Sequence, residues 1–148
     1  MLRSILMGLV AGQRSMTPLA ALAVAARRGT LPHDTAEGRL MGHPLVAAGG
    51  VAMAAAEMAG DKMKTAPDRT VVLGLLARTI TGGFAGAALA PPQRRFAGAA
   101  LGIGAAIAAS YCGLAARKRA MRQVSQTSSG VAEDAIMLSA AFAIANAR

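Results

Sequence analysis

Aromatic residues are scarce in this chain, which has no tryptophan, one tyrosine and three phenylalanines among its 148 residues. Proteins that bind single-stranded nucleic acids stack the bases on aromatic side chains. The 16 basic residues outnumber the 7 acidic ones and would otherwise favour a nucleic-acid partner. Because no aromatic residues are interleaved with the basic clusters, we expect no nucleic acid to bind.

Residues that commonly carry enzyme or metal chemistry are also few. Cys112 is the single cysteine, which excludes an internal disulfide and a cysteine-based metal motif. His33 and His43 are ten positions apart, which is not a metal-ligand spacing. Ser15 has no evident base in the sequence, and no glycine-rich phosphate loop follows a strand. We therefore expect no enzymatic activity, no metal and no cofactor.

Charged residues make up 16% of the chain, whereas about 25% is usual for soluble domains. Hydrophobic residues reach 54%, and the mean hydropathy is +0.44. Many of the apolar residues are alanines, and 17 glycines add further small side chains, which let helices approach closely in lipid. The composition predicts an all-α integral membrane protein with a single domain, residues 1–148.

The apolar stretches predict about five membrane segments, because a crossing takes roughly 20 helical residues. The first and third stretches are interrupted by Pro18 and by Gly82-Gly83. Each of these two is compatible with a pair of half-helices, a kinked span or a re-entrant segment. The candidate segments are residues 4–26, 43–60, 71–90, 96–116 and 131–147.

Basic residues form short clusters between these stretches, a pattern typical of membrane proteins that attract anionic lipid headgroups. We predict a multi-pass protein of the cell inner membrane. With five full crossings, the side that holds the N-terminus has eight basic residues and the other side has six, which favours a cytoplasmic N-terminus. That count loses its meaning if the interrupted segments are re-entrant. The clusters are Arg27-Arg28, Lys62 with Lys64, Arg94-Arg95, and Arg117-Lys118-Arg119 with Arg122.

An internal repeat is indicated by the two interrupted segments. Arg14-Ser15-Met16-Thr17 precedes Pro18, and Arg78-Thr79-Ile80-Thr81 precedes Gly82-Gly83. The repeat units would be residues 4–64 and 71–122, followed by a final helix at 131–147; chance similarity among alanines is the alternative. A charge beside a helix break, at matching places in two apolar segments, indicates a binding site within a membrane.

Four acidic residues are placed to pair with Arg14 and Arg78. Glu57 and Asp61 are four positions apart and share one face of the second segment. Glu133-Asp134 open the final segment, where first-turn acids can also act as caps. We predict a buried network of both arginines with Glu57 and one of the other three acids. Thr17 and Thr81 would supply hydroxyl groups at the breaks.

Glycines spaced four apart mark flat helix faces in the third and fourth segments. These are Gly82 with Gly86 and Gly98 with Gly102. They fit close packing within one chain, or alternatively a seam between two copies. A homodimer is expected because so small a bundle can hardly enclose a pathway alone.

Several stretches share a pattern with a known family: Ala56-Glu57-Met58-Ala59-Gly60-Asp61-Lys62, Lys64-Thr65-Ala66-Pro67-Asp68-Arg69-Thr70, Arg78 with Gly82-Gly83, Ala11-Gly12-Gln13-Arg14-Ser15 and Glu133-Asp134. Over most of its length the chain resembles a short, alanine-rich member of a bacterial membrane family catalogued as domain-of-unknown-function family 4126. The resemblance implies a multi-spanning membrane protein and brings no established activity, substrate or cofactor.

Two functions fit these patterns. The first is a channel or transporter that binds a small polar or ionic solute at the buried cluster of arginines and carboxylates. In it, the arginines and the helix N-termini after the breaks attract negative charge, while the carboxylates carry protons or cations. The alternative is a membrane scaffold or assembly protein in which the same ion pairs only lock the bundle.

Overall fold

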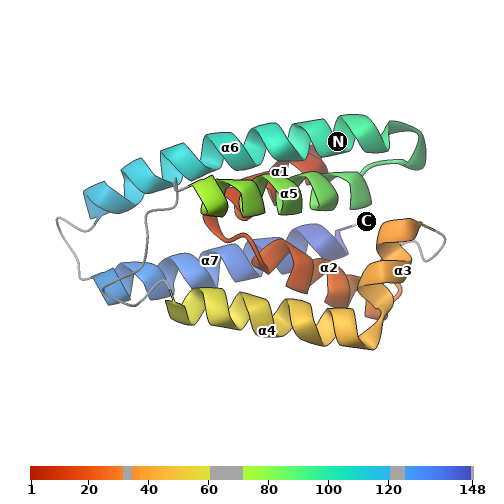
Figure 1. Ribbon diagram of the computed structural model, residues 1–148, viewed down its shortest axis with the longest axis horizontal. Helices are drawn as coiled ribbons and strands as arrows, with labels where there is room; N and C mark the ends of the chain where they lie inside the picture. The colour runs from red at the N-terminus through yellow and green to blue at the C-terminus, as the bar shows by residue number, and fades with distance from the viewer. Residues whose placement is uncertain (32–34, 61–71, 121–125, 148) are drawn as a thin grey trace.

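The computed structural model describes residues 1–31, 35–60, 72–120 and 126–147. Within these residues the chain forms helices and no strand, which confirms the all-α prediction (Figure 1). The helices are α1 (Leu2–Gln13), α2 (Thr17–Arg27), α3 (Ala36–Gly42), α4 (Pro44–Gly60), α5 (Val72–Ala88), the 3₁₀ turn η1 (Pro92–Arg94), α6 (Arg95–Ala120) and α7 (Gln126–Asn146).

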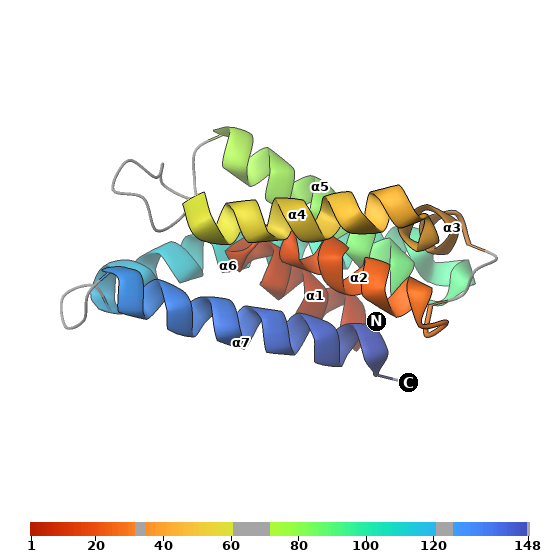
Figure 2. The same ribbon diagram turned by 90° about the horizontal axis from the view of Figure 1, so that it is seen from below.

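The first apolar stretch folds as a helical hairpin made of α1 and α2. Arg14, the residue after α1, has extended backbone angles, and Pro18 occupies the first turn of α2, where its missing N–H costs little. Near the start of α1, Arg3 donates from Nε to the Ile144 carbonyl at 3.1 Å. Just after α2, Thr30 donates to Asn146 Oδ1 at 3.3 Å. Both ends of the hairpin therefore lie beside the C-terminal end of α7 (Figures 1 and 2).

The hairpin also affects the prediction of how the chain is oriented in a membrane. Arg3 lies at the same end of the bundle as the end of α2, not at the opposite end as five full crossings require. The prediction of a cytoplasmic N-terminus depended on five full crossings and therefore loses its support.

The break predicted at Gly82-Gly83 is wrong, because α5 continues without interruption from Val72 to Ala88. These glycines serve close packing instead. A Cβ added at Gly82 would lie 2.9 Å from the Gly102 carbonyl oxygen, and one added at Gly86 would overlap the Gly98 carbonyl. Glycine without a neighbouring proline leaves the helical hydrogen bonds intact, so the helix tolerates it where two backbones must meet.

Two layers make up the bundle. In the first, α1, α5 and α6 pack closely on one another, and in the second, α2 lies among α3, α4 and α7 (Figure 1). The hairpin belongs to both layers, and α7 contacts both of its helices. The shared core contains few bulky side chains, among them Met7, Leu22 and Leu89, and is otherwise mostly alanine.

The connections are more helical than the sequence indicated. Residues 27–42, which lie between the first two predicted segments, contain α3. This helix begins after Thr35, whose hydroxyl accepts a hydrogen bond from Gly38 N at 3.0 Å. Residues 117–130, between the fourth and fifth predicted segments, are entered by α6 from one side and by α7 from the other. The connection at 61–70 lies outside the described residues.

The surface of the described part is rich in large apolar side chains. Each long helix exposes some of them, including Leu45 on α4, Leu73 on α5 and Phe96 on α6, which are 77%, 79% and 93% exposed. By length and composition, one helical stretch among the described residues, Pro92–Ala116, is able to cross a membrane. The helices α2, α4 and α5 are apolar but shorter, so the five predicted segments are not confirmed.

Candidate functional site

The turn of the hairpin, residues 13–16, carries a fully buried arginine. Arg14 is 0% exposed, and its Nη2 lies 2.7 Å from Oδ1 of Asp134 on α7. Its backbone N–H donates to the Val10 carbonyl at 2.8 Å and closes the last turn of α1. A buried guanidinium needs a carboxylate of this kind, because an unpaired charge in a low-dielectric interior is costly.

Glu57, near the end of α4, binds the beginning of α2. Its Oε1 accepts from the backbone N–H and the hydroxyl of Ser15, at 2.8 and 2.7 Å. Its Oε2 accepts from the backbone N–H of Met16 at 2.8 Å. A carboxylate is favoured there by the positive end of the α2 dipole. The helix N-terminus that was expected to attract an anionic solute is therefore occupied by a carboxylate of the same chain.

Neighbouring polar side chains fasten the turn to α6. Gln13 donates from Nε2 to the Ala109 carbonyl at 2.8 Å, and Ser110 donates to the Gly12 carbonyl at 3.2 Å. Neither Gln13 nor Ser110 was predicted to bind the turn. In the sequence, the only indication of such a role is that Gln13 is adjacent to Arg14. Ser110 lies almost a hundred residues from Gly12, and its role depends on how α1 and α6 meet.

Arg78 lies on α5 at the level of this turn. Gly12 of α1 and Gly82 of α5 both pack against Ala106 of α6, and Arg78 precedes Gly82 by about one helical turn. The Arg78 side chain is buried, at 6% exposure. The two arginines therefore lie at the same level of the bundle, Arg14 in the hairpin turn and Arg78 on α5.

The two predicted hydroxyl groups are in different situations. Thr81 donates to the Ala77 carbonyl within α5 at 2.9 Å, so it does not lie at a break as predicted. Thr17 does lie at the break, at the start of α2, and is fully buried. Among the described residues, its hydroxyl oxygen has no hydrogen-bond partner.

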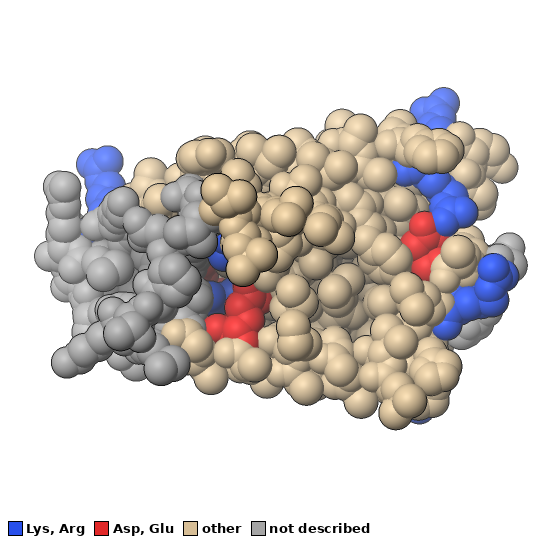
Figure 3. Space-filling model, in the orientation of Figure 1, with Lys and Arg blue, Asp and Glu red and all other residues tan. Residues whose placement is uncertain are grey.

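The remaining acidic residues also differ from their predicted places. α7 begins at Gln126, so Glu133 and Asp134 lie about two turns inside the helix, and the interpretation of them as first-turn caps is wrong. Asp134 instead faces Arg14, and one carboxylate oxygen of Glu133 is buried. Asp61 lies outside the described residues. Figure 3 shows acidic atoms at the surface beside recessed basic atoms, close to the end of α4.

The hairpin cluster is defined here as Arg14, Glu57, Arg78, Glu133 and Asp134. Its three carboxylates outnumber its two guanidinium groups. The part of the chain that the structure describes holds no group of three or more His, Cys, Asp or Glu residues arranged to bind a metal. Chemically, the cluster can hold fixed charge in an apolar bundle, and its carboxylates are groups that can bind a proton or a cation.

Comparison with known proteins adds no assignment. Neither a protein-family model, nor a curated protein, nor a solved structure matches this chain. The resemblance to domain-of-unknown-function family 4126 therefore stays a prediction.

A second ion pair lies at the opposite end of the bundle from the hairpin turn. Arg95, at the start of α6, donates a short hydrogen bond to Glu37 of α3. Burial alone would raise the pKa of Glu37, but the hydrogen bond and charge of Arg95 together with a backbone hydrogen bond outweigh it, so the pKa lies below its ordinary value. This pair ties the short helix α3 to α6.

Proposed function

We propose that this protein is a small multi-pass protein of the cell inner membrane. The supporting observation is the distribution of side chains, since large apolar residues point outward from the long helices while Arg14, Arg78 and Asp134 are buried. A helix that is apolar on all sides and not covered by protein is typical of a membrane environment. Basic residues at the ends of the bundle would contact anionic headgroups.

Within that membrane protein, we propose that the hairpin cluster passes or binds a small cation, protons included. Ionisable residues at membrane depth mark solute or ion pathways by default. A cation is favoured over an anion because the Glu57 carboxylate occupies the N-terminus of α2, where an anion would otherwise bind. Glu57 is only partly buried, so a solute can reach the cluster from outside at this residue. Arg14 is fully buried and is not accessible in this way.

Two copies would then form the working unit, because a bundle of this size leaves little room for a pathway of its own. The repeat units 4–64 and 71–122 remain part of the proposal, although only the first contains a broken helix. The proposal includes no enzymatic step.

The test is a flux panel in proteoliposomes covering protons, alkali cations, halides, phosphate and small carboxylates. Wild type is compared with Glu57→Gln, Arg14→Gln and Arg78→Gln, each checked for monodispersity. Arg94→Gln is the matched control, because Arg94 is exposed and lies at the far end of the bundle. We expect cation or proton flux in wild type and in the control, reduced to the rate of empty vesicles in folded Glu57→Gln. Flux limited to anions would contradict the cation assignment.

A scaffold function is the second candidate. It is favoured because the charged groups at the turn already bind other groups of the same chain. Arg14 is fully buried against Asp134, and the Glu57 carboxylate already accepts three hydrogen bonds. If the network is only structural, no solute on the panel should pass, and Arg14→Gln should lose stability or assembly rather than flux.

A further inference from the structure

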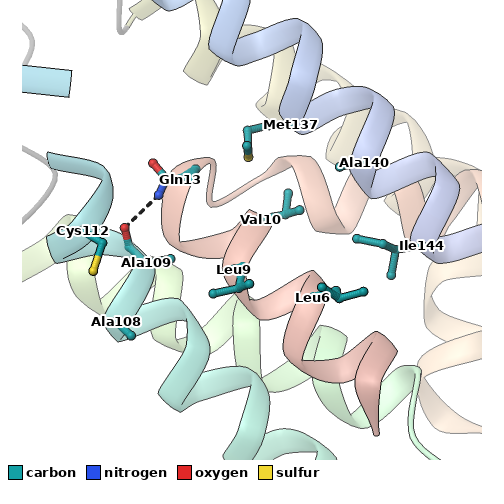
Figure 4. A pocket seen from close by; sticks show the side chains of 10 residues that line it. All are labelled: Leu6, Leu9, Val10, Gln13, Ala108, Ala109, Cys112, Met137, Ala140 and Ile144. Carbon is teal, nitrogen blue, oxygen red and sulfur yellow. Dashed lines mark hydrogen bonds between the residues drawn. The ribbon is translucent and has the colours of Figure 1, made fainter. Parts of the chain in front are cut away.

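An apolar groove runs along the outside of the hairpin between α1, α6 and α7. Its volume is about 430 Å³. Figure 4 shows Leu6 and Ile144 facing each other at one end, with Gln13 and Cys112 at the other. Residues from all three helices line it, among them Leu6, Leu9, Ala108, Cys112, Ala140 and Ile144.

The groove is open to the surface, but its lining has few groups that can form hydrogen bonds with water. Leu6 and Leu9 are 37% and 41% exposed, and Ala108 and Cys112 are exposed as well. Gln13 is the single polar side chain of the lining apart from the Cys112 thiol, and its amide nitrogen is bonded to the Ala109 carbonyl. An ordered water needs two to four polar partners, so an apolar ligand fits this space better than water does.

A basic side chain stands at the end of the groove that Leu6 and Ile144 form. Arg3 precedes Leu6 by one turn of α1 and donates from Nε and Nη2 to the carbonyls of Ile144 and Ala145, at 3.1 and 3.0 Å. Its Nη1 makes no hydrogen bond to the described residues. Arg3 lies at the end of the bundle that holds both chain termini, where a lipid phosphate would sit.

We infer that this groove binds one acyl chain of an anionic phospholipid, with the lipid phosphate held by Arg3. The inference rests on the proposed membrane location. A helix about 10 Å across fills roughly 120 Å³ per residue, so the groove holds no more than about one helical turn of a second protein. An acyl chain is thinner than a helix, and a volume of about 430 Å³ can hold one.

The headgroup determines which lipid stays bound. Moving an acyl chain from the bilayer into the groove yields no hydrophobic gain, because lipid tails are as apolar as the groove. Retention then depends on close contact along the chain and on the charge-assisted bond between Arg3 and phosphate. A basic residue at the membrane surface favours an anionic headgroup by about fivefold.

The experiment is native mass spectrometry of the purified full chain after equilibration with equal amounts of phosphatidylglycerol and phosphatidylcholine. We expect one retained lipid per chain, with phosphatidylglycerol preferred about fivefold. Arg3→Gln should abolish the preference. Ala108→Phe, which fills the groove, should lose the lipid, whereas Ala100→Phe should keep it, because Ala100 is exposed on the same helix and does not line the groove.

A modification after folding covers the case in which Ala108→Phe does not fold. Cys112 is exposed, lines the groove and is the only cysteine, so a bulky maleimide attached to it should also displace the lipid. A lipid retained by both the filled variant and the labelled protein overturns the inference. Dimers without lipid that cross-link through Cys112 would overturn it too and assign the groove to a second copy. Release of the protein from membranes by carbonate would instead defeat the proposed membrane location.

Discussion

Arg14 illustrates how a charged residue is buried in an apolar bundle despite the cost of removing its charge from water. Its side chain is fully buried and meets Asp134, while the adjacent backbone N–H groups of Ser15 and Met16 donate to Glu57. Each charge at the turn is thus balanced by a group from another helix. The three segments 13–16, α4 and α7 consequently depend on one another for their charge balance.

The Arg14–Asp134 pair can be tested by removing one partner at a time. Arg14→Gln or Asp134→Asn should each lower the free energy of unfolding by about 3–5 kcal/mol, because the remaining charge stays buried. The double variant should be less destabilised than the sum of the two. Denaturant unfolding in detergent, arranged as a double-mutant cycle, measures this coupling. The exposed residue Arg94, changed to Gln, should alter the free energy by less than about 0.5 kcal/mol.

At the scale of elements, glycine and proline have opposite effects in two segments that look alike in sequence. Pro18 follows Arg14-Ser15-Met16-Thr17 and begins a new helix, whereas Gly82-Gly83 follows Arg78-Thr79-Ile80-Thr81 inside a continuous one. Proline removes a backbone donor and so starts a helix well but rarely continues one. Glycine removes only a side chain, and α6 takes up the space that this leaves.

Close packing of α5 on α6 predicts a sharp contrast between two glycines of α6. A Cβ at Gly102 would overlap the Gly82 carbonyl, whereas one at Gly104 would meet nothing within 4 Å. Gly102→Ala should therefore destabilise the protein by about 1–3 kcal/mol through overpacking. Gly104→Ala should stabilise it by up to about 1 kcal/mol, through helix propensity. Thermal unfolding of both variants checks this, and equal effects would contradict the observed contact.

The pair of Glu37 with Arg95 predicts a dependence of stability on pH. The pKa of Glu37 is lowered in the folded state, so the pair stabilises the protein above the ordinary glutamate value of about 4.3. This contribution is lost as the pH falls through the lower, folded value. Wild type should unfold at a higher temperature than Glu37→Gln at pH 7, and the difference should shrink toward pH 3. A difference independent of pH would show that the carboxylate charge contributes nothing.

At the scale of the whole molecule, the helical hairpin of α1 and α2 determines where the chain termini lie. Since α1 and α2 enter and leave at the same end, the start of α1 and the end of α7 are neighbours (Figure 1). Five full crossings would have separated them. An even number of crossings follows for the proposed membrane protein.

Reporter fusions test this arrangement directly. A fluorescent reporter that matures only in the cytoplasm, attached to either terminus, should give the same signal from both. A mixed orientation would lower both signals equally. Opposite signals from the two termini would contradict the hairpin and restore an odd number of crossings.

Much of the fold could be predicted from local pattern. The apolar stretches at 43–60, 71–90, 96–116 and 131–147 match α4, α5, α6 and α7 closely, because their length and composition favour helices in any packing. A carboxylate partner for Arg14 could be predicted because buried charges must pair, and Asp134 was one of the candidates. The hydrogen bonds of Glu57 to Ser15 and Met16 were not predicted. The roles of Gln13 and Ser110 could not be predicted, since ordinary polar residues give no signal until their neighbours are known.

The sequence by itself determined that the chain is helical, apolar and rich in small residues, and that its few interior charges need partners. Those properties follow from composition and spacing, which act over a few residues. Only the tertiary structure decided that the first interruption is a turn between two antiparallel helices and the second a packing face, and that Glu57 caps α2. Those outcomes depend on which backbones approach one another across long sequence separations. The contact of α5 with α6 and the contact of α2 with α4 supply the energy that selects one local conformation over another.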